Sequence, residues 1–198
     1  MPFLLTAITS YLLGSIPFGY LLVRIFRGED VRKTGSGNIG ATNVARTSSA
    51  LGAATLLLDA VKGFTAVALA RQLRPSDTLF MAVAALFAIA GHMFPVWLRW
   101  RGGKGVATAL GSFLCMAPKP VLVMVAIFLV AVAASRYISL GSIVAALCFP
   151  VLVVFMEHYH GSSTLLITAA CALILVRHHE NIRRLVQGTE SKFSLGRK

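Results

Sequence analysis

Acidic residues are scarce in this sequence, which has only seven Asp or Glu among 198 residues and 13% charged residues in all. Because soluble domains contain about 25% charged residues, this composition excludes a water-soluble globule. The scarcity of polar residues also excludes a disordered chain, since 57% of the residues are hydrophobic and disordered segments lack apolar surface to bury. The net charge of +12 favours anionic lipid headgroups or phosphorylated substrates over nucleic acid as partners.

Cysteine is also rare, and its positions offer no metal-ligand spacing. All three cysteines lie within apolar runs: Cys115, Cys148 and Cys171. Such positions are typical of small core residues rather than of disulfides or metal ligands. Glu157, His158 and His160 lie together in a connector, but no further ligand accompanies them. We therefore expect no metal and no cofactor.

Long apolar runs dominate the chain and are separated by short polar or Gly/Pro segments. The seven runs are 3–23, 51–70, 79–98, 105–117, 121–134, 139–156 and 162–176. Inside hydrocarbon every backbone polar group needs an internal partner, so each run is predicted to be a helix. The first run has neither a basic start nor a cleavage site, and we expect it to be retained as a span.

The lengths of the runs decide how many of them cross a membrane. A bilayer core of ~30 Å needs about 20 helical residues, and the runs 105–117 and 121–134 are marginal by that measure. Pro118 and Pro120 separate these two runs, because proline cannot continue a helix. We predict one all-α integral membrane domain over residues 1–198, a polytopic helical bundle with seven transmembrane helices. Five spans are the alternative.

Basic residues predict the orientation of the spans, because Lys and Arg near span ends are retained in the cytoplasm. With seven spans and an external N-terminus, fifteen fall on the cytoplasmic side: Arg24, Arg27, Arg32, Lys33, Arg46, Arg99, Arg101, Lys104, Arg136, Arg177, Arg183, Arg184, Lys192, Arg197 and Lys198. Only three fall outside: Arg71, Arg74 and Lys119. The asymmetry predicts an N-terminus outside and a C-terminus in the cytoplasm.

The first polar segment, Gly35–Arg46, contains glycines in the G-x-G-x-x-G spacing. A dinucleotide site is excluded, because that motif requires a preceding strand, whereas apolar helices flank this segment. Glycines still let backbone N–H groups approach a phosphate at a helix start. From about residue 40 the segment is expected to be helical, with three polar side chains on one face: Asn38, Thr42 and Arg46. A plain polar loop is the alternative.

The second polar segment, Gly91–Thr108, contains a glycine-rich turn with one lysine, Lys104, where the fourth run begins. A P-loop is unlikely, because positions 98 and 105 hold Leu98 and Gly105 instead of Gly and Ser or Thr. Such a turn at a helix N-terminus suits a smaller phosphate. A basic turn at the membrane surface is the alternative, and His92 fits packing and a site role equally well.

The third polar segment, Arg177–Glu190, contains His178 and Asn181 at i, i+3. This spacing predicts that both side chains lie on one face of a terminal helix, where a substrate can dock. A basic tail on anionic lipid is the alternative.

Asp59 and Lys62 are ionisable residues within the second span. We expect a buried ion pair that shapes the bundle, with direct substrate contact as the alternative.

These segments resemble the signature motifs of the bacterial acyl-phosphate:glycerol-3-phosphate acyltransferase family (PlsY). The motifs that carry the resemblance are Ser36–Arg46, Gly91-His-x-Phe-Pro with Gly102–Thr108, and His178–Glu190. Leu12–Tyr20 and Asp59–Gly63 are similar to that family as well. The resemblance runs nearly from end to end of the chain.

The resemblance implies an inner-membrane enzyme of phospholipid synthesis, with its active site on the cytoplasmic side. Such an enzyme moves a fatty acyl group from acyl phosphate to the 1-hydroxyl of sn-glycerol 3-phosphate, and its products are lysophosphatidic acid and phosphate. A soluble enzyme that makes acyl phosphate is the implied partner. The implied catalytic residues are His178, Asn181, Lys104, Ser36 and Arg46. The implied substrate- or phosphate-binding residues are Asn38, Thr42, Asn43, Gly102, Gly103, Gly105 and Glu190.

Two questions stay open at this point. The proton of the attacking hydroxyl can go to His178 as general base or to the phosphate of the acyl donor, and the second route is favoured because no His/Asp dyad is evident. A small phosphate or organophosphate transporter uses the same residue types. The short external connectors carry no polar motif for alternating access, which argues against the transporter.

Overall fold

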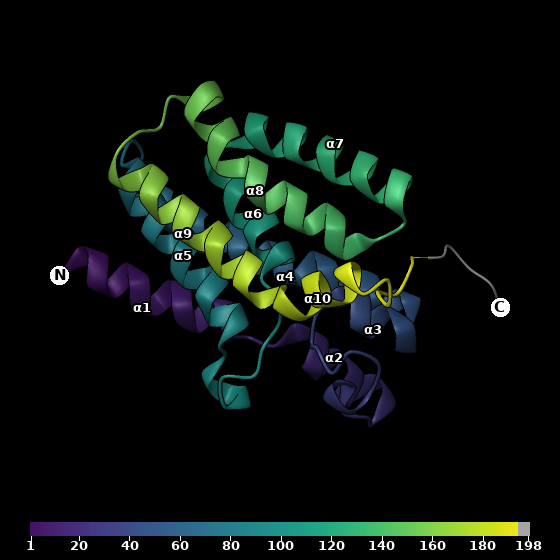
Figure 1. Ribbon diagram of the computed structural model, residues 1–198. Coiled ribbons are helices and arrows are strands. Elements are labelled where there is room, and N and C mark those ends of the chain that lie inside the picture. Colours follow the sequence, from purple (N-terminus) through teal and green to yellow (C-terminus); the bar gives the residue numbers. More distant parts are fainter. Residues whose placement is uncertain (194–198) are drawn as a thin grey trace. The chain divides into compact units, whose positions relative to one another are not determined.

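The computed structural model describes residues 1–193, and within that range every regular element is a helix (Figure 1). This confirms the predicted all-α class. The chain packs into two compact units, residues 1–116 and 117–198. That residues 1–198 form a single domain stays a prediction.

Unit 1 contains six α-helices and two 3₁₀ turns. They are α1 (Pro2–Gly14), α2 (Phe18–Arg27), η1 (Val31–Lys33), α3 (Ala41–Thr47), α4 (Ser49–Leu73), α5 (Thr78–Met93), η2 (Val96–Leu98) and α6 (Val106–Met116). α4 packs along α6 and α5, and α1 packs along α5. Glycines permit these approaches: a Cβ at Gly14 would overlap the backbone of Ala88, and one at Gly111 would overlap the backbone of Ala60. Small residues at helix crossings are typical of membrane bundles.

The first apolar run is broken in the structure. α1 ends at Gly14 and α2 begins at Phe18, so one continuous helix over 3–23 is wrong. Pro17 has no N–H to continue the helical hydrogen bonding, and the carbonyl of Ile16 accepts a hydrogen bond from Lys62 Nζ at 2.7 Å. The break therefore has a partner in α4 that satisfies its exposed backbone.

Unit 2 contains α7 (Pro118–Ser135), α8 (Ile138–Glu157), α9 (Ser162–Arg177) and α10 (His179–Val186). α8 packs against α7 and α9. The predicted break between the fourth and fifth runs is confirmed, but α7 begins at Pro118 rather than at residue 121, because the first helical turn does not need the missing N–H. α9 and α10 meet at an angle of 54° across His178, which ends one helix and begins the other.

Five helical segments are long and apolar enough to cross a membrane, or six if the bent α9 and α10 pair counts as one span. α6 has 11 residues, which at about 1.5 Å per residue is shorter than the hydrocarbon core. The structure thus confirms a polytopic membrane protein. The seven-span count and the sides of the termini stay predictions. Arg197 and Lys198, which the charge count placed in the cytoplasm, lie outside the described residues.

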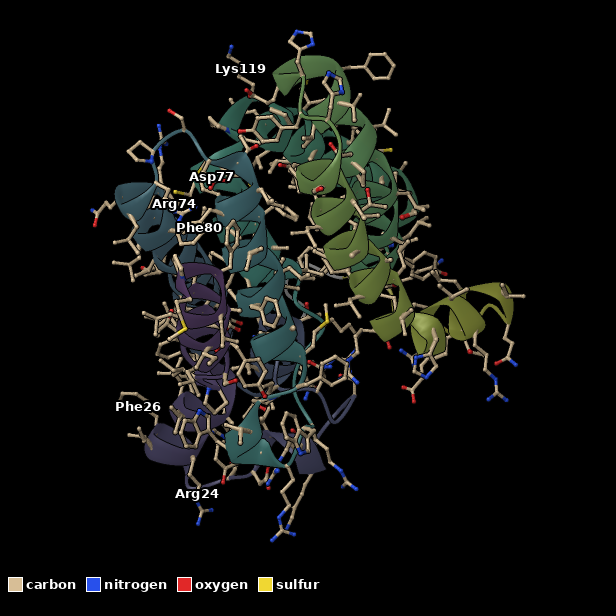
Figure 2. The ribbon with its side chains drawn as sticks, turned by 90° about the vertical axis from the view of Figure 1, so that its left-hand side faces the viewer. Arg24, Phe26, Arg74, Asp77, Phe80 and Lys119 are labelled. Atoms are coloured by element: carbon tan, nitrogen blue, oxygen red, sulfur yellow. The ribbon has the colours of Figure 1, made fainter. Side chains whose placement is uncertain are left out.

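The two ends of unit 1 differ in the side chains they carry. Figure 2 shows Arg74, Asp77 and Phe80 at one end and Arg24 and Phe26 at the other. α4 and α5 are joined at the Arg74 end, so the first residues of α4 and the last residues of α5 lie at the Arg24 end. Both polar segments of unit 1 connect to the helices at this second end.

We expect Gly111→Ala to lower the thermal stability of the protein in detergent. The added methyl group would overlap the backbone of Ala60, so α4 and α6 would have to separate, and overpacking of this kind costs about 1–3 kcal/mol. Thermal unfolding followed by circular dichroism measures the change. Leu114→Met, at an exposed position of α6, is the control. An equal Tm for Gly111→Ala and the parent would contradict the close helix contact.

Candidate functional site

A single buried side chain, Asn43, organises the loop that precedes α3. Its amide nitrogen donates to the carbonyls of Val31 at 3.1 Å, Thr34 at 3.1 Å and Asn38 at 2.8 Å. Its amide oxygen accepts the backbone N–H of Ser36 at 2.9 Å. These four contacts use the amide within the protein, and each lost contact would leave a costly unpaired polar group. Asn43 therefore shapes the loop from inside, and its predicted contact with a phosphate stays a prediction.

Three other polar side chains predicted at this site are exposed: Ser36, Thr42 and Arg46. Gly35 has φ +55°, and a Cβ there would lie 3.2 Å from Arg46 Nη1. The glycine thus allows both the left-handed turn and the close approach of the guanidinium. Arg46 forms no ion pair with any residue of the described range 1–193. Its charge is available to an anion.

The expected helical face of Asn38, Thr42 and Arg46 is only partly formed. α3 begins at Ala41, and Asn38 Oδ1 accepts the backbone N–H of Gly40 at 2.8 Å. An Asn side chain that bonds the backbone two residues on forms a turn in place of a helix. The placement of Asn38 on the helix was therefore wrong, whereas Thr42 and Arg46 are four residues apart on α3.

An ion pair between near neighbours begins the same loop. Asp30 Oδ1 accepts the backbone N–H of Arg32 at 3.0 Å and its Nε at 2.9 Å, and Oδ2 accepts Nη2 at 2.7 Å. Hydrogen bonding from the Arg32 guanidinium lowers the pKa of Asp30 to about 2. The guanidinium also lies 4.9 Å from the ring centroid of Tyr20. Arg32 is thus engaged within the protein, unlike Arg46.

The glycine-rich turn that carries Lys104 is attached to the end of α5. The backbone N–H of Gly102 donates to the carbonyl of Met93 at 3.1 Å, and that of Gly103 donates to the carbonyl of His92 at 3.0 Å. Gly105 has φ +82°, which favours glycine. Both amides pair with protein carbonyls here, so the charged group that the turn presents is the half-buried Lys104 side chain.

Next to this turn lies a buried ionisable cluster, which we define as Asp59, Lys62 and His92. The Lys62 ammonium lies 2.8 Å from Asp59 Oδ1 and 3.0 Å from His92 Nδ1, and it donates to the carbonyl of Ile16 at 2.7 Å. All three side chains are buried. An ammonium has three N–H donors, and these contacts match them in number. The sequence suggested a pair, and the structure adds His92 as a third member.

The two polar segments of unit 1 attach to the same stretch of α4. A Cβ at Gly19 would overlap the carbonyl of Ile39 and lie 3.0 Å from the methyl group of Thr55, so the end of the first loop lies beside Thr55. Asp59, one helical turn further along, belongs to the ionisable cluster next to Gly103. Four residues of α4, about 6 Å along the helix, therefore separate the attachments of the two segments.

In unit 2, His178 and Asn181 are both buried. His178 Nδ1 lies 2.8 Å from the carbonyl of Ile174. A carbonyl only accepts hydrogen bonds, so Nδ1 carries a proton, and in the neutral ring the lone pair is on Nε2. Asn181 Nδ2 donates to Glu190 Oε1 at 2.7 Å. The bend between α9 and α10 sets both side chains at the end of α9.

Glu190 connects three segments of unit 2. Its Oε1 accepts hydrogen bonds from Ser139 Oγ at 2.8 Å and from Asn181, and its Oε2 accepts Arg184 Nε at 2.7 Å. Burial by itself raises the pKa of this carboxyl, but the hydrogen bonds from Arg184, Asn181 and Ser139 outweigh it and lower the pKa. Glu190 thus holds α10 and the following segment to the start of α8. Its predicted substrate contact stays a prediction.

Each unit therefore holds part of the predicted set. Unit 1 contains Ser36, Asn38, Thr42, Asn43, Arg46, Asp59, Lys62, Gly102, Gly103, Lys104 and Gly105, and unit 2 contains His178, Asn181 and Glu190. Sequence reasoning left the role of His92 undecided and missed Ser139. A signal existed for His92, because a buried ammonium needs three acceptors and Asp59 supplies only one group. Ser139 offered no signal, since nothing near it in sequence marks it.

Apolar spans combined with basic, glycine-rich segments define an integral membrane protein suited to anionic substrates. The chain belongs to the glycerol-3-phosphate acyltransferase family, because the model of that family matches residues 4–188. The glycerol-3-phosphate acyltransferase of Trichlorobacter lovleyi is 50% identical over 187 residues, covering 93% of this chain and 94% of that protein. The one of Geobacter sulfurreducens is 48% identical over 191 residues, covering 96% of each.

Two solved structures share the fold. Crystal structures of PlsY (YgiH), an integral membrane glycerol 3-phosphate acyltransferase, match with TM-scores of 0.92 and 0.89 at 37% and 35% identity. Each match covers 98% of this chain and 96% of the other. The first is the glycerol 3-phosphate form and the second the lysophosphatidic acid form. The resemblance inferred from the motifs is confirmed, and an enzyme is favoured over a transporter.

We expect Glu190→Gln to lower stability at neutral pH by roughly 1–2 kcal/mol, because the charged hydrogen bonds of the carboxylate are lost. The pKa of Glu190 is lowered by folding, so its contribution is present above its ordinary value of 4.5 and is lost as the pH falls through the lowered value. Thermal unfolding of both proteins between pH 7 and pH 3 measures this. The difference in Tm should close at the acidic end.

The control is Glu180→Gln, which removes an exposed carboxylate 3.8 Å from the same Arg184. Exposed pairs contribute little, so this variant should match the parent at every pH. A Tm difference for Glu190→Gln that is constant from pH 7 to pH 3 would contradict the charged role of Glu190.

Proposed function

We propose that this chain transfers a fatty acyl group from acyl phosphate to the 1-hydroxyl of sn-glycerol 3-phosphate. The products are lysophosphatidic acid and inorganic phosphate, and the reaction acylates glycerol 3-phosphate for phospholipid synthesis. The observation that carries the proposal is the match to PlsY in two forms, one with glycerol 3-phosphate and one with lysophosphatidic acid. These two molecules differ by one acyl group, and so they are acceptor and product of a single transfer.

The chemistry of an acyl phosphate donor suits the residues of this chain. An acyl phosphate is a mixed anhydride and is already activated, so the protein does not need a covalent nucleophile. The hydroxyl oxygen of the acceptor attacks the acyl carbon, the bond from that carbon to the phosphate oxygen breaks, and phosphate leaves. The enzyme then has to hold two anionic groups close together and stabilise the negative charge that develops.

Cations of unit 1 are the groups proposed for these anions. Arg46 is exposed and has no ion pair among residues 1–193, and an arginine can bind a phosphate through two parallel hydrogen bonds. Lys104 supplies a second positive charge from the glycine-rich turn. The Ser36 hydroxyl, exposed on the loop that Asn43 shapes, adds a donor. The common attachment of both segments to α4 supports their acting together.

Residues of unit 2 are proposed to position glycerol 3-phosphate and to handle its proton. Because Nδ1 of His178 donates to the Ile174 carbonyl, the lone pair of the neutral ring is on Nε2, which is the form a general base requires. The other route passes the proton to the phosphate of the donor, and we favour it because the sequence motifs contain no evident His/Asp dyad. Asn181, fixed by Glu190, would orient the substrate.

The proposed setting is the bacterial inner membrane, with the site on the cytoplasmic side. The charge asymmetry of the sequence supports this side, because the three polar segments share it in the predicted orientation. The proposed partner is a soluble enzyme that makes acyl phosphate, since the donor is reactive and has to be supplied nearby. No nucleic acid is involved.

Purified protein offered radiolabelled glycerol 3-phosphate with acyl phosphate, acyl-CoA or acyl carrier protein should form lysophosphatidic acid only with acyl phosphate. Lys104→Ala should lower kcat/KM by at least about 100-fold, the loss typical of removing one charge-stabilising group. Lys119→Ala, at the start of α7, should leave the rate unchanged. Product formation from acyl-CoA alone, or an active Lys104→Ala, would overturn the assignment.

His178→Ala, assayed with both substrates saturating, separates the two proton routes. If the donor phosphate takes the proton, the loss should fall mainly on KM, with kcat reduced by less than about tenfold. A general base would be worth about 100-fold or more in kcat. The Tm of the variant is measured alongside, so that a folding defect is not mistaken for a catalytic one.

A further inference from the structure

We infer that His92 is a positioning residue for the turn that carries Lys104, acting through the backbone of Gly103. The inference rests on the proposed function, since it concerns the binding of a phosphate group at that turn. His92 lies near the end of α5, within the buried ionisable cluster, and no step of the proposed reaction uses its ring.

One edge of the His92 ring is the surface on which the turn lies. A Cβ at Gly103 would overlap Nε2 and lie 2.8 Å from Cε1 and 2.9 Å from Cδ2. The glycine therefore brings its backbone into direct contact with the imidazole. The carbonyl of His92 also accepts the N–H of Gly103 at 3.0 Å. The residue before Lys104 is thus held by the ring and by the backbone of the same histidine.

The other edge of the ring is fixed by the Lys62 ammonium, 3.0 Å from Nδ1. An ammonium can only donate, so Nδ1 is the acceptor of the Lys62 contact, and Asp59 Oδ1 lies 3.5 Å from the same atom. With a charged Lys62, the proton of the neutral ring is on Nε2, the atom nearest Gly103. Lys62 is itself held by Asp59 and by the Ile16 carbonyl. The orientation of the imidazole is therefore fixed by contacts among α5, α4 and the break between α1 and α2, independently of the turn.

This arrangement differs from simple packing. An apolar side chain of the same volume would fill the space under Gly103 but would give Lys62 no acceptor. A ring without an acceptor atom for Lys62 is not held in one orientation, and so the turn that contacts the ring moves. Since Lys104 directly follows Gly103, a small displacement of the backbone shifts the ammonium relative to its phosphate. A misplacement of about 1 Å can lower the reaction rate by about 100-fold.

Two variants each remove one of the two contacts of the His92 ring. His92→Phe keeps a ring under Gly103 and removes the acceptor, whereas His92→Asn keeps an acceptor near the position of Nδ1 and removes the far edge of the ring. We expect both to weaken glycerol 3-phosphate binding by about tenfold, measured by isothermal titration calorimetry in detergent, and to raise KM more than they lower kcat. A pure packing role would leave the affinity of His92→Phe at the parental value, and this result would overturn the inference.

A double-mutant cycle tests whether His92 acts through the turn. Combined with Lys104→Ala, the His92→Phe change should weaken binding much less than tenfold, because the group that it positions is already missing. Full additivity of the two losses would overturn the inference. Phe80→Leu is the control, a buried position of α5 at the Arg74 end (Figure 2). It should lower Tm without changing affinity.

The calorimetric readout does not require acyl transfer. A parent protein that binds glycerol 3-phosphate but forms no product from acyl phosphate would refute the proposed function while the His92 variants still decide the inference. A parent protein that binds neither glycerol 3-phosphate nor inorganic phosphate would refute both.

Discussion

The buried ammonium of Lys62 is the contact on which the arrangement of unit 1 depends. It joins three segments that are far apart in sequence: the break between α1 and α2 at Ile16, the middle of α4 at Asp59, and the end of α5 at His92. Removing one partner of a buried ion pair typically costs 3–5 kcal/mol, because the other charge is left uncompensated. The Lys62–Asp59 pair therefore contributes little net stability, but it determines which segments of unit 1 contact one another.

That contact also explains how an apolar bundle keeps irregular segments in place. The chain breaks at Ser15–Pro17 and again at the glycine-rich turn, and both breaks expose backbone groups that hydrocarbon cannot satisfy. The carbonyl of Ile16 pairs with Lys62, and the turn pairs with the last carbonyls of α5. Irregular backbone is tolerated at these places because neighbouring side chains and helix ends supply its hydrogen bonds.

The helices could be predicted from sequence, because the length and apolar composition of each run are local properties that can be compared with the thickness of a bilayer. The break inside the first run was missed although Gly14 and Pro17 lie within it. The partner of the Ile16 carbonyl could not be predicted, because Lys62 lies in another helix. The residue types of the site could also be predicted, because the polar motifs are visible in the local sequence. The hydrogen-bond partners of these residues could not be predicted. Asn43 and Glu190 carry the polar groups expected of ligands, yet their contacts are with the protein, because hydrogen-bond partners depend on tertiary approach.

The scarcity of acidic residues, together with their ion pairs, also favours the binding of anionic substrates. All seven lie within residues 1–193, and six have a cationic partner there: Glu29, Asp30, Asp59, Asp77, Glu180 and Glu190. Each of these carboxylates lies close to the cation it pairs with, often within four residues of it in sequence. A carboxylate near Arg46 or Lys104 would compete with a substrate phosphate for the same charge. An enzyme that gathers two anionic substrates therefore gains from having few acids and from holding six of the seven in ion pairs with other cations.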